Sequence, residues 1–539
     1  MKVIQMAKIG KNILEHLTTG MYADSKVTYR EYVQNACDQI DKAIQMGILA
    51  SNEAEVEIYI DPRKRYISVV DNATGVASEQ FVSQLGDIAN SDKTLGVNKG
   101  FRGIGRLCGL AYCKTLVFTT SYKGESIKSY MKFDAKLMRE MIQSEVKYSV
   151  DDILQAIVKT GVEKEERDKH YFKVEMFDIN QENTDLLDPK MVRDYLSFVA
   201  PVPYTNKFLL RSSIYAYAKE KAFKIDEYKI TVNGAQLFKE YKTRLYEGGD
   251  TSLKAYDEIS QIAFKDFYDD NGRLIAWAWY GLSRFEKAIP KSLNPMYGFR
   301  LRQGNIQIGD NTVVASLFKE PRGNSYFVGE IFAVAKELIP NSQRNYFNEN
   351  KTRVQLEDSL RTFFYDELHR LYHIANETKS DYKKVSAYNE AVKKLQETAA
   401  RGFVDSKEQA KMEAEVDTAR QRMDQAIRRL GKTTTSTSDS GSTAQTPEQV
   451  VRQAIKKKYD VAIEADAPNP AGIEKKEKEK ETEKEKGKEP VKAKYFTESL
   501  SKLDRSKRRL VQQIMAIVNN VAPKEVADDI RKAIEKEFR

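Results

Sequence analysis

Apolar and polar residues alternate in several short segments of the chain and follow a helical period in others. Residues 54–61, 65–71 and 114–122 carry the alternating or continuous apolar pattern of strands, with helical patterns and glycine-rich loops between them. Strand patterns also dominate residues 205–350, where DDNGR predicts a turn between two strands. Amphipathic helical patterns follow, to about Leu430. The pattern therefore predicts an α+β fold that continues into a helical region.

The same pattern divides the chain into five predicted parts. Two mixed α/β domains occupy residues 1–203 and 204–351, a helical and possibly coiled-coil region covers 352–432, a low-complexity linker covers 433–494, and a small helical module covers 495–539. Serine and threonine crowd residues 433–447, and lysine with glutamate crowds 474–490, which are compositions typical of solvated spacers. The last module has apolar residues at helical spacing around RSKRR, which favours docking on a partner.

A short heptad seam runs through the helical region. It consists of Met412, Val416, Ala419, Met423, Ala426 and Leu430. A helical hairpin within the chain and a coiled coil between two chains would each bury this seam. The sequence leaves both alternatives open.

Composition and charge narrow the class of protein only a little. The 539 residues include 88 basic and 79 acidic residues, and the net charge of +9 does not by itself establish nucleic-acid binding. The three cysteines show no pairing with histidine that would indicate a zinc site, and they are too few for a disulfide framework. No signal-peptide core and no apolar run of membrane-spanning length is found. We expect a cytoplasmic protein with reduced cysteines and no membrane partner.

Three polar residues share one face of the helix predicted over residues 29–43. Glu31, Asn35 and Asp38 are separated by four and three residues, so they form one narrow stripe. The opposite face carries Val33, Ala36 and Ile40. Taken alone, such a polar stripe is usually solvated, and only neighbouring motifs give it a functional meaning.

A second candidate site lies where a predicted strand ends. In ISVVDNATGV, residues 67–76, the strand ends at Asp71 and the chain turns through Gly75. A carboxylate fixed there can accept a hydrogen bond from the exocyclic amine of adenine, and a glycine lets a base approach the backbone. The alternative is ordinary turn chemistry, which commonly places aspartate at a strand end.

A third candidate is the glycine-rich segment NKGFRGIGRLCGLAYC, residues 98–113. Gly100, Gly103, Gly105 and Gly109 precede or open an apolar helical pattern, so several backbone amides can converge on phosphate oxygens near a helix N-terminus. The segment lacks the Gly-Lys-Ser/Thr of a Walker loop and the βαβ context of a Rossmann site. The alternative is a flexible loop without a ligand.

These motifs, in this order, resemble a known family. REYVQNACDQIDKA, DNATGV, IANSDK and GFRGIGR together resemble the nucleotide-binding motifs of the GHKL ATPases, which include heat-shock chaperone, gyrase-type, mismatch-repair and Microrchidia ATPases. The resemblance implies a Bergerat fold, with helices on one face of a mixed sheet, that binds ATP and Mg²⁺.

The resemblance also implies roles for individual residues. Glu31 would deprotonate the attacking water, Asn35 would bind Mg²⁺, and Asp38 would support this face from behind. Asp71 and Gly75 would receive adenine. The remaining candidates for nucleotide binding belong to the lid and the glycine-rich segment: Ser91, Lys93, Gly100, Gly103, Ile104 and Gly105.

A second resemblance covers the next domain. GFRLRQGNIQIGD, VGEIFAV and LIPNSQRNYF resemble the middle domain of the heat-shock chaperone group, a transducer-like domain in which a loop arginine reaches toward the γ-phosphate. Arg344 matches that arginine and would stabilise charge in the transition state, against the alternative of an ordinary surface arginine. Two positions depart from the family pattern. Ala73 replaces a common glycine, and HYFKVEMF lacks the usual Gly-Thr before the last strand of the sheet.

Three functions are compatible with these resemblances. The first is a dimeric, chaperone-like ATP hydrolase that works on a protein client. The second is a DNA-handling clamp of the mismatch-repair or Microrchidia kind. The third is an ATP-gated scaffold whose biological role does not need hydrolysis.

Overall fold

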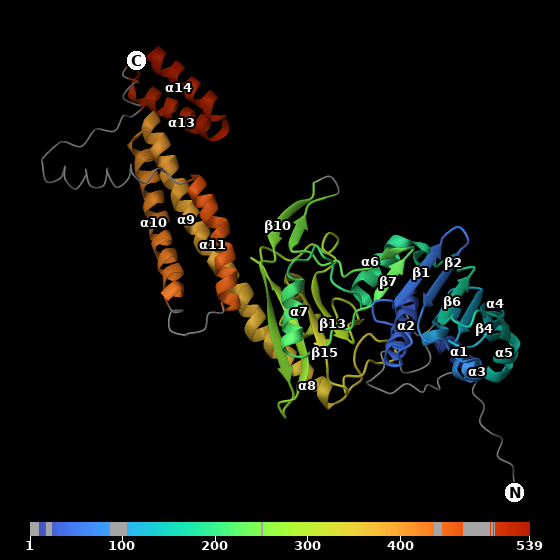
Figure 1. Cartoon of the computed structure of the whole chain (residues 1–539). Coiled ribbons are helices and arrows are strands. Elements are labelled where there is room, and N and C mark those ends of the chain that lie inside the picture. The colour runs from blue at the N-terminus through green and yellow to red at the C-terminus, as the bar shows by residue number, and fades with distance from the viewer. Residues whose placement is uncertain are drawn as a thin grey trace, which may run out of the picture. The chain divides into compact units, whose positions relative to one another are not determined.

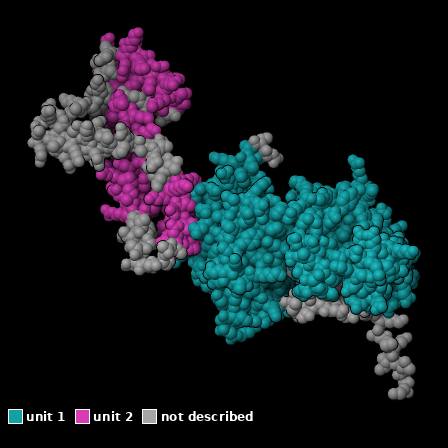
Figure 2. All heavy atoms as spheres, viewed as in Figure 1, with its two compact units in different colours: residues 1–370 teal, residues 371–539 magenta. Residues whose placement is uncertain are grey.

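The computed structural model describes residues 10–17, 24–86, 105–249, 252–435, 445–466, 496, 500 and 502–538. The chain divides into two compact units, Met1–Arg370 and Leu371–Arg539 (Figure 2). The first unit contains both predicted α/β domains, and the second unit is helical. None of the described helices combines the length and the apolar sequence needed to cross a bilayer.

Among the described residues, the first sheet of unit 1 has eight strands in the order β5-β4-β3-β6-β2-β1-β7-β8. Their bounds are β1 Glu55–Asp61, β2 Tyr66–Asp71, β3 Thr115–Ser121, β4 Ile127–Asp134, β5 Val158–Lys164, β6 Tyr171–Phe177, β7 Lys229–Val232 and β8 Ala235–Gln236. The β1–β7 pair is parallel, and the other neighbours are antiparallel. The sheet is therefore mixed, as the sequence predicted.

Helices pack on this sheet because its strands present one apolar face. In β1, buried Val56, Ile58 and Ile60 alternate with more exposed residues. The helices of this part are α1 Asn12–Leu17, α2 Val27–Gln45, α3 Ser78–Gly86, α4 Ala135–Gln143, α5 Val150–Ile157 and α6 Pro189–Val199, with short 3-10 helices η1 Gly105–Ala111 and η2 Thr184–Leu187 (Figure 1). Helix α2 packs against β1, β2 and η1. The predicted arrangement of helices on a mixed sheet is confirmed.

A five-stranded sheet forms the second α/β part among the described residues, in the order β11-β12-β15-β13-β14. Its strands are β11 Gln261–Tyr268, β12 Leu274–Leu282, β13 Gly298–Gln303, β14 Ile306–Ile308 and β15 Val328–Ala333. A two-stranded ribbon, β9 Arg244–Glu247 with β10 Lys254–Glu258, accompanies it. The other elements are α7 Arg211–Glu220, 3-10 helices η3 Ala315–Leu317 and η4 Pro321–Tyr326, α8 Lys351–Thr362 and the π-helical segment η5 Phe363–Leu368.

The border between these two parts differs from the predicted boundary at residue 203. Strand β7 lies beyond that boundary, yet it pairs with β1 and completes the first sheet, with Ile58 opposite Val232. The chain thus crosses into the second part, passes through α7, and returns to the first sheet. Asn233 reinforces this return, because its side chain exchanges hydrogen bonds of 2.8 and 3.0 Å with the backbone of Ile60.

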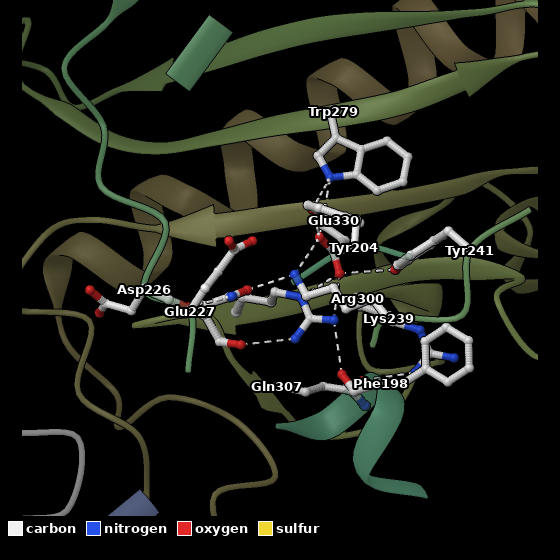
Figure 3. Close-up of polar contacts among 12 residues, drawn as sticks. Phe198, Tyr204, Asp226, Glu227, Lys239, Tyr241, Trp279, Arg300, Gln307 and Glu330 are labelled. Carbon is white, nitrogen blue, oxygen red and sulfur yellow. Dashed lines mark hydrogen bonds and ion pairs between the residues drawn. The ribbon is translucent and has the colours of Figure 1, made fainter. Parts of the chain in front are cut away.

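A buried polar network stabilises the second sheet (Figure 3). Its centre is Glu330 on β15, which is fully buried between the cations Arg302 and Lys239. Tyr204, Tyr241 and Trp279 also donate to its carboxylate. Arg302 donates in addition to the carbonyl of Phe198 at the end of α6, at 2.8 Å, so the network fixes the segment that leaves the first domain.

Unit 2 begins within a long helix and is helical throughout its described part. Its helices are α9 His369–Arg401, α10 Ser406–Thr435, α11 Pro447–Asp466, α13 Arg505–Val521 and α14 Lys524–Phe538. Arg429 of α10 forms an ion pair with Asp381 of α9 at 2.6 Å, and Tyr459 of α11 stacks on Tyr382 of α9. The heptad seam of α10 is buried or half-buried at every position. The structure therefore favours the intrachain alternative for this seam.

Helix α11 lies inside the region predicted to be a linker, residues 433–494. Val450, Val451 and Ile455 are buried in it, which gives the segment a packed face that the surrounding low-complexity sequence concealed. Arg452 also donates to Thr378 of α9 at 3.2 Å. The linker prediction is thus wrong for residues 447–466, and most of the rest of that range lies outside the described residues.

The C-terminal helices α13 and α14 form a small module with an unusual distribution of apolar residues. One side of α13 packs into a core through Met515, Val511 and Val518. Another side leaves Leu510, Ile514, Ile517 and Val521 exposed by 45 to 80%. We call these four residues the α13 stripe.

Candidate functional site

The polar face predicted on α2 is not solvated at its two acidic positions. Glu31 and Asp38 retain only 5 and 6% of their exposure, and Asn35 is half-buried. The opposite face is buried as well, with Val33 and Ile40 at 1 and 0%. A buried carboxylate needs partners, so the contacts of Glu31 are informative.

Two guanidinium groups contact the same oxygen of Glu31. Nη2 of Arg30 lies 3.1 Å from Oε1, and Nε of Arg344 lies 3.3 Å from it. The other oxygen, Oε2, faces Gly105, where a side chain would place its Cβ atom within 2.4 Å of that oxygen. The structure therefore brings together three residues that the sequence placed in separate motifs: Glu31, Gly105 and Arg344.

Arg344 reaches Glu31 from the loop between β15 and α8. Its φ is +54°, in the left-handed region that non-glycine residues seldom adopt. Its carbonyl accepts from Gly309 at 2.8 Å and its amide donates to Asn341 at 3.1 Å. The side chain is buried, at 7% exposed, so the surface alternative does not describe it. Strained backbone of this kind is often found at functional sites.

The described part of the glycine-rich segment forms η1, packed on α2. The hydroxyl of Tyr32 accepts from the amide of Gly109 at 3.1 Å and donates to the carbonyl of Arg106 at 3.2 Å. A Cβ at Gly109 would lie 2.3 Å from that hydroxyl, so only glycine fits. Burial, and then the charge of Glu31, raise the pKa of the Cys108 thiol to about 12, which keeps this thiol neutral.

The turn after β2 is closely packed. Asp71 is buried, and its Oδ1 accepts from the amide of Ala73 at 3.1 Å. Gly75 has a φ of +66°, and a Cβ there would lie 1.9 Å from the carbonyl oxygen of Ser121. The hydroxyl of Thr74 lies 3.3 Å from Oε1 of Gln39, which ties the turn to α2. The strand end predicted at Asp71 is confirmed.

Five candidates lie outside the described residues, and their roles stay predictions. They are Ser91, Lys93, Gly100, Gly103 and Ile104. Of the predicted lid and glycine-rich candidates, the structure places Gly105, at the first residue of η1.

Comparison with known proteins identifies the region that contains these motifs. Residues 26–169 match the family described as histidine kinase-, DNA gyrase B-, and HSP90-like ATPase. This region is similar to that ATPase family. Chaperone protein HtpG of Halorhodospira halophila is 33% identical over 87 residues, and that of Hydrogenovibrio crunogenus is 29% identical over 85. Each match covers 15% of this chain and 14% of the relative, so the chain spans about one seventh of these relatives.

Within the matched region, the residues present fit a nucleotide and its metal. Gly75 and Gly105 lie where a side chain would collide with the backbone of Ser121 or with Glu31, so backbone approaches closely at both places. Asn35 offers one amide oxygen, which suits Mg²⁺ because this ion keeps several waters and phosphate oxygens as its other ligands. Asp71 offers a buried acceptor for an amine. The individual assignments remain predictions.

Arg30 is a site residue that was not predicted from the sequence. This residue directly precedes Glu31 and donates to it through Nε as well as Nη2, and Nη2 also lies 3.4 Å from the carbonyl of Gln343. Arg30 is adjacent to Glu31 in the sequence, and this was the signal that could have indicated their contact. Adjacent residues on a helix do not face the same way, however, so the contact could not be assumed.

Proposed function

We propose that the chain is an ATP hydrolase whose nucleotide-dependent closure does conformational work on a macromolecule, in the manner of a chaperone. The observation that carries this proposal is the contact of Arg344 with Glu31, because it joins the second α/β part to the ATPase domain at the predicted catalytic carboxylate. A nucleotide bound beside Glu31 would compete for Arg344. Binding would thereby change the contact between the two parts.

In this proposal, each described residue has a defined task. Glu31 accepts a proton from the attacking water once a guanidinium group has left its Oε1. Arg344 moves to the γ-phosphate and stabilises the charge that develops during transfer. Asn35 holds Mg²⁺, which when bound neutralises phosphate charge. Asp71 accepts the amine of adenine and so selects the base.

The protein client and the dimer are further parts of the proposal. The matched relatives are named chaperones, which favours a protein client over DNA. We propose that two chains associate through the α13 stripe, whose exposed residues are symmetric in sequence about its midpoint. In an antiparallel pair, Leu510 would lie opposite Val521 of the partner subunit, and Ile514 opposite Ile517 of the partner subunit.

Two substitutions in the ATPase domain test the proposed reaction. Glu31→Ala should bind Mg·ATP with nearly wild-type affinity but hydrolyse it at least about 100-fold more slowly, because the general base is lost. Asp71→Asn should lose nucleotide binding, because the carboxamide has an NH₂ donor in place of one of the two acceptor oxygens of the carboxylate. Steady-state turnover and nucleotide titration separate the two effects. Wild-type turnover by the Glu31→Ala enzyme would refute the role of Glu31.

Three assays on the full chain distinguish the three candidate functions. Suppression of client aggregation without affinity for DNA supports the chaperone. Binding to duplex DNA that weakens steeply with salt supports the clamp instead. Full biological activity of a Glu31→Ala chain that no longer hydrolyses ATP supports the scaffold.

Sedimentation of the full chain tests the dimer. The wild type should sediment as a dimer, and the double variant Ile514→Glu with Ile517→Glu should be a monomer with unchanged helix content. Ile427→Glu is the matched control, because Ile427 is 49% exposed on α10 but lies outside the α13 stripe. A monomeric wild type, or a dimer that survives the double substitution, would contradict this interface.

A further inference from the structure

The two departures from the family pattern meet in space. Ala73 stands in the turn after β2, and His170 immediately precedes β6. Nδ1 of His170 lies 2.7 Å from the carbonyl oxygen of Ala73. A carbonyl oxygen can only accept, so Nδ1 carries the hydrogen and donates it. His170, which stands where the family has Gly-Thr near the last strand, therefore holds Ala73, which stands where the family has glycine.

Other hydrogen bonds join the same turn to the same strands. The amide of Val76 donates to Oγ1 of Thr120 at 2.9 Å, and that hydroxyl donates to the carbonyl of Tyr171 at 2.8 Å. Ser121 donates to the carbonyl of Lys169 at 3.0 Å. The end of β3 thus ties one side of the turn to the segment that carries His170, and this segment is itself fixed.

His170 acts on the middle of the turn, at Ala73, the residue that contacts Asp71. The amide of Ala73 donates to Oδ1 of Asp71, while the carbonyl of Ala73 accepts from His170. Gly75 is packed closely against β3, because a Cβ atom built on it would lie 1.9 Å from the carbonyl oxygen of Ser121. Fixing the Ala73 carbonyl therefore limits where the Asp71 carboxylate can point.

We propose that His170 is a positioning residue for base recognition. By holding Ala73 it orients the Asp71 carboxylate toward the exocyclic amine of adenine, and so it favours adenine nucleotides over nucleotides whose base lacks that amine. This inference rests on the proposed function, in which ATP binds at Asp71. It assigns His170 no contact with the reacting phosphate.

Nucleotide titrations of the full chain test the proposal with two probes, Mg·ATP and Mg·ITP, whose base has an oxygen in place of the amine. His170→Phe keeps a ring but removes the donor. It should bind ATP about threefold to tenfold more weakly, as expected for one lost hydrogen bond. Its affinity for ITP and its turnover at saturating ATP should stay close to wild type. His170→Asn supplies an amide donor and should restore most of the ATP affinity.

Controls separate positioning from a general loss of structure. His373→Phe makes the same exchange at an exposed position of α9 and should leave both affinities unchanged. If His170→Phe does not fold, His170→Ala provides the same comparison with a smaller side chain. Equal losses for ATP and ITP, or wild-type ATP affinity in the folded variant, would overturn the role of His170. Failure of the folded wild type to bind ATP would overturn the proposed function itself.

Discussion

Two buried carboxylates of unit 1, Glu31 and Glu330, each lie between two cations. Glu330 is fully buried and receives hydrogen bonds at both oxygens. Oε1 accepts from Tyr241 and Arg302, and Oε2 accepts from Tyr204, Lys239 and Trp279. Glu31 is 5% exposed, its two guanidinium partners contact Oε1, and Oε2 faces a glycine.

The electrostatics of the Glu330 network explain why it is suited to stability. Burial alone would raise the pKa of Glu330, but Arg302 and then Lys239 hold it down to about 2. Burial and the neighbouring Arg302 lower the pKa of Lys239 to about 7, while Glu330 acts in the opposite direction and favours the charged ammonium. A carboxylate this strongly held cannot serve as a base at neutral pH.

A structural carboxylate differs from a candidate catalytic one in how firmly its partners are held. Two partners of Glu330, Arg302 and Trp279, lie on strands β13 and β12 of the same sheet. The other three, Tyr204, Lys239 and Tyr241, are fully buried, so none of the five can leave without disrupting the core. The partners of Glu31 are an adjacent helical residue and a loop residue with left-handed backbone, and such a loop contact can be exchanged for a ligand. We therefore expect substitutions at Glu330 to change stability, and substitutions around Glu31 to change turnover.

The largest expected effect is the loss of stability in Glu330→Ala. Removing the carboxylate leaves Arg302 and Lys239 buried without their counterion, which should lower the free energy of unfolding by about 3–5 kcal/mol. Urea denaturation measures this change. Glu320→Ala is the control, because the ion pair of Glu320 with Arg322 is exposed, and its loss should change stability by less than about 0.5 kcal/mol. Equal losses of unfolding free energy in the two variants would show that the buried Glu330 network contributes no more to stability than an exposed ion pair.

The stability contributed by Glu330 should also depend on pH. Its folded pKa lies below the ordinary value of 4.5, so its contribution is complete above about pH 4.5 and is lost as pH falls toward 2. The difference in unfolding free energy between the wild type and Glu330→Gln should therefore shrink across that range. A difference that stays constant from about pH 5 to about pH 2.5 would show that the charge of Glu330 is not what stabilises the sheet.

Arg344→Gly should produce a smaller effect, which falls mainly on turnover and less on the free energy of unfolding. Turnover should fall about 100-fold, because one preorganised donor to the transition state is lost. The free energy of unfolding should fall by less than in Glu330→Ala, since Arg30 still pairs with Glu31 and glycine adopts a φ of +54° without strain. Arg344→Lys keeps the charge and should recover part of the turnover. A large stability loss with normal turnover would place Arg344 with the structural cations instead.

The sequence predicted the parts of the site that depend on local pattern. The period of α2 placed Glu31 and Asp38 on one face, and the apolar run of β2 placed Asp71 at its end. The match of Arg344 to a loop arginine came from family resemblance, and the structure brings it to Glu31. Each of these features is encoded within a few consecutive residues.

Features that depend on distant pairing could not be read in the same way. Strand β7 has an ordinary strand pattern, and nothing in its residues shows that it joins β1 rather than the nearer second sheet. Lys239 and Glu330 are 91 residues apart, and although Glu330 stands in VGEIFAV, nothing in that motif points to Lys239. The contact of His170 with Ala73 spans 97 residues. Partners of this kind are fixed by tertiary packing, which one-dimensional patterns do not contain.

Calorimetric titration of the folded full chain with Mg·ATP tests the central claim most directly, because all the assigned roles require a nucleotide beside Glu31 and Asp71. We predict saturable binding by the wild type and by Glu31→Ala, and loss of binding in Asp71→Asn. Wild-type protein that takes up no adenine nucleotide, or Asp71→Asn protein that binds it as tightly as wild type, would show that this is not an adenine-nucleotide site.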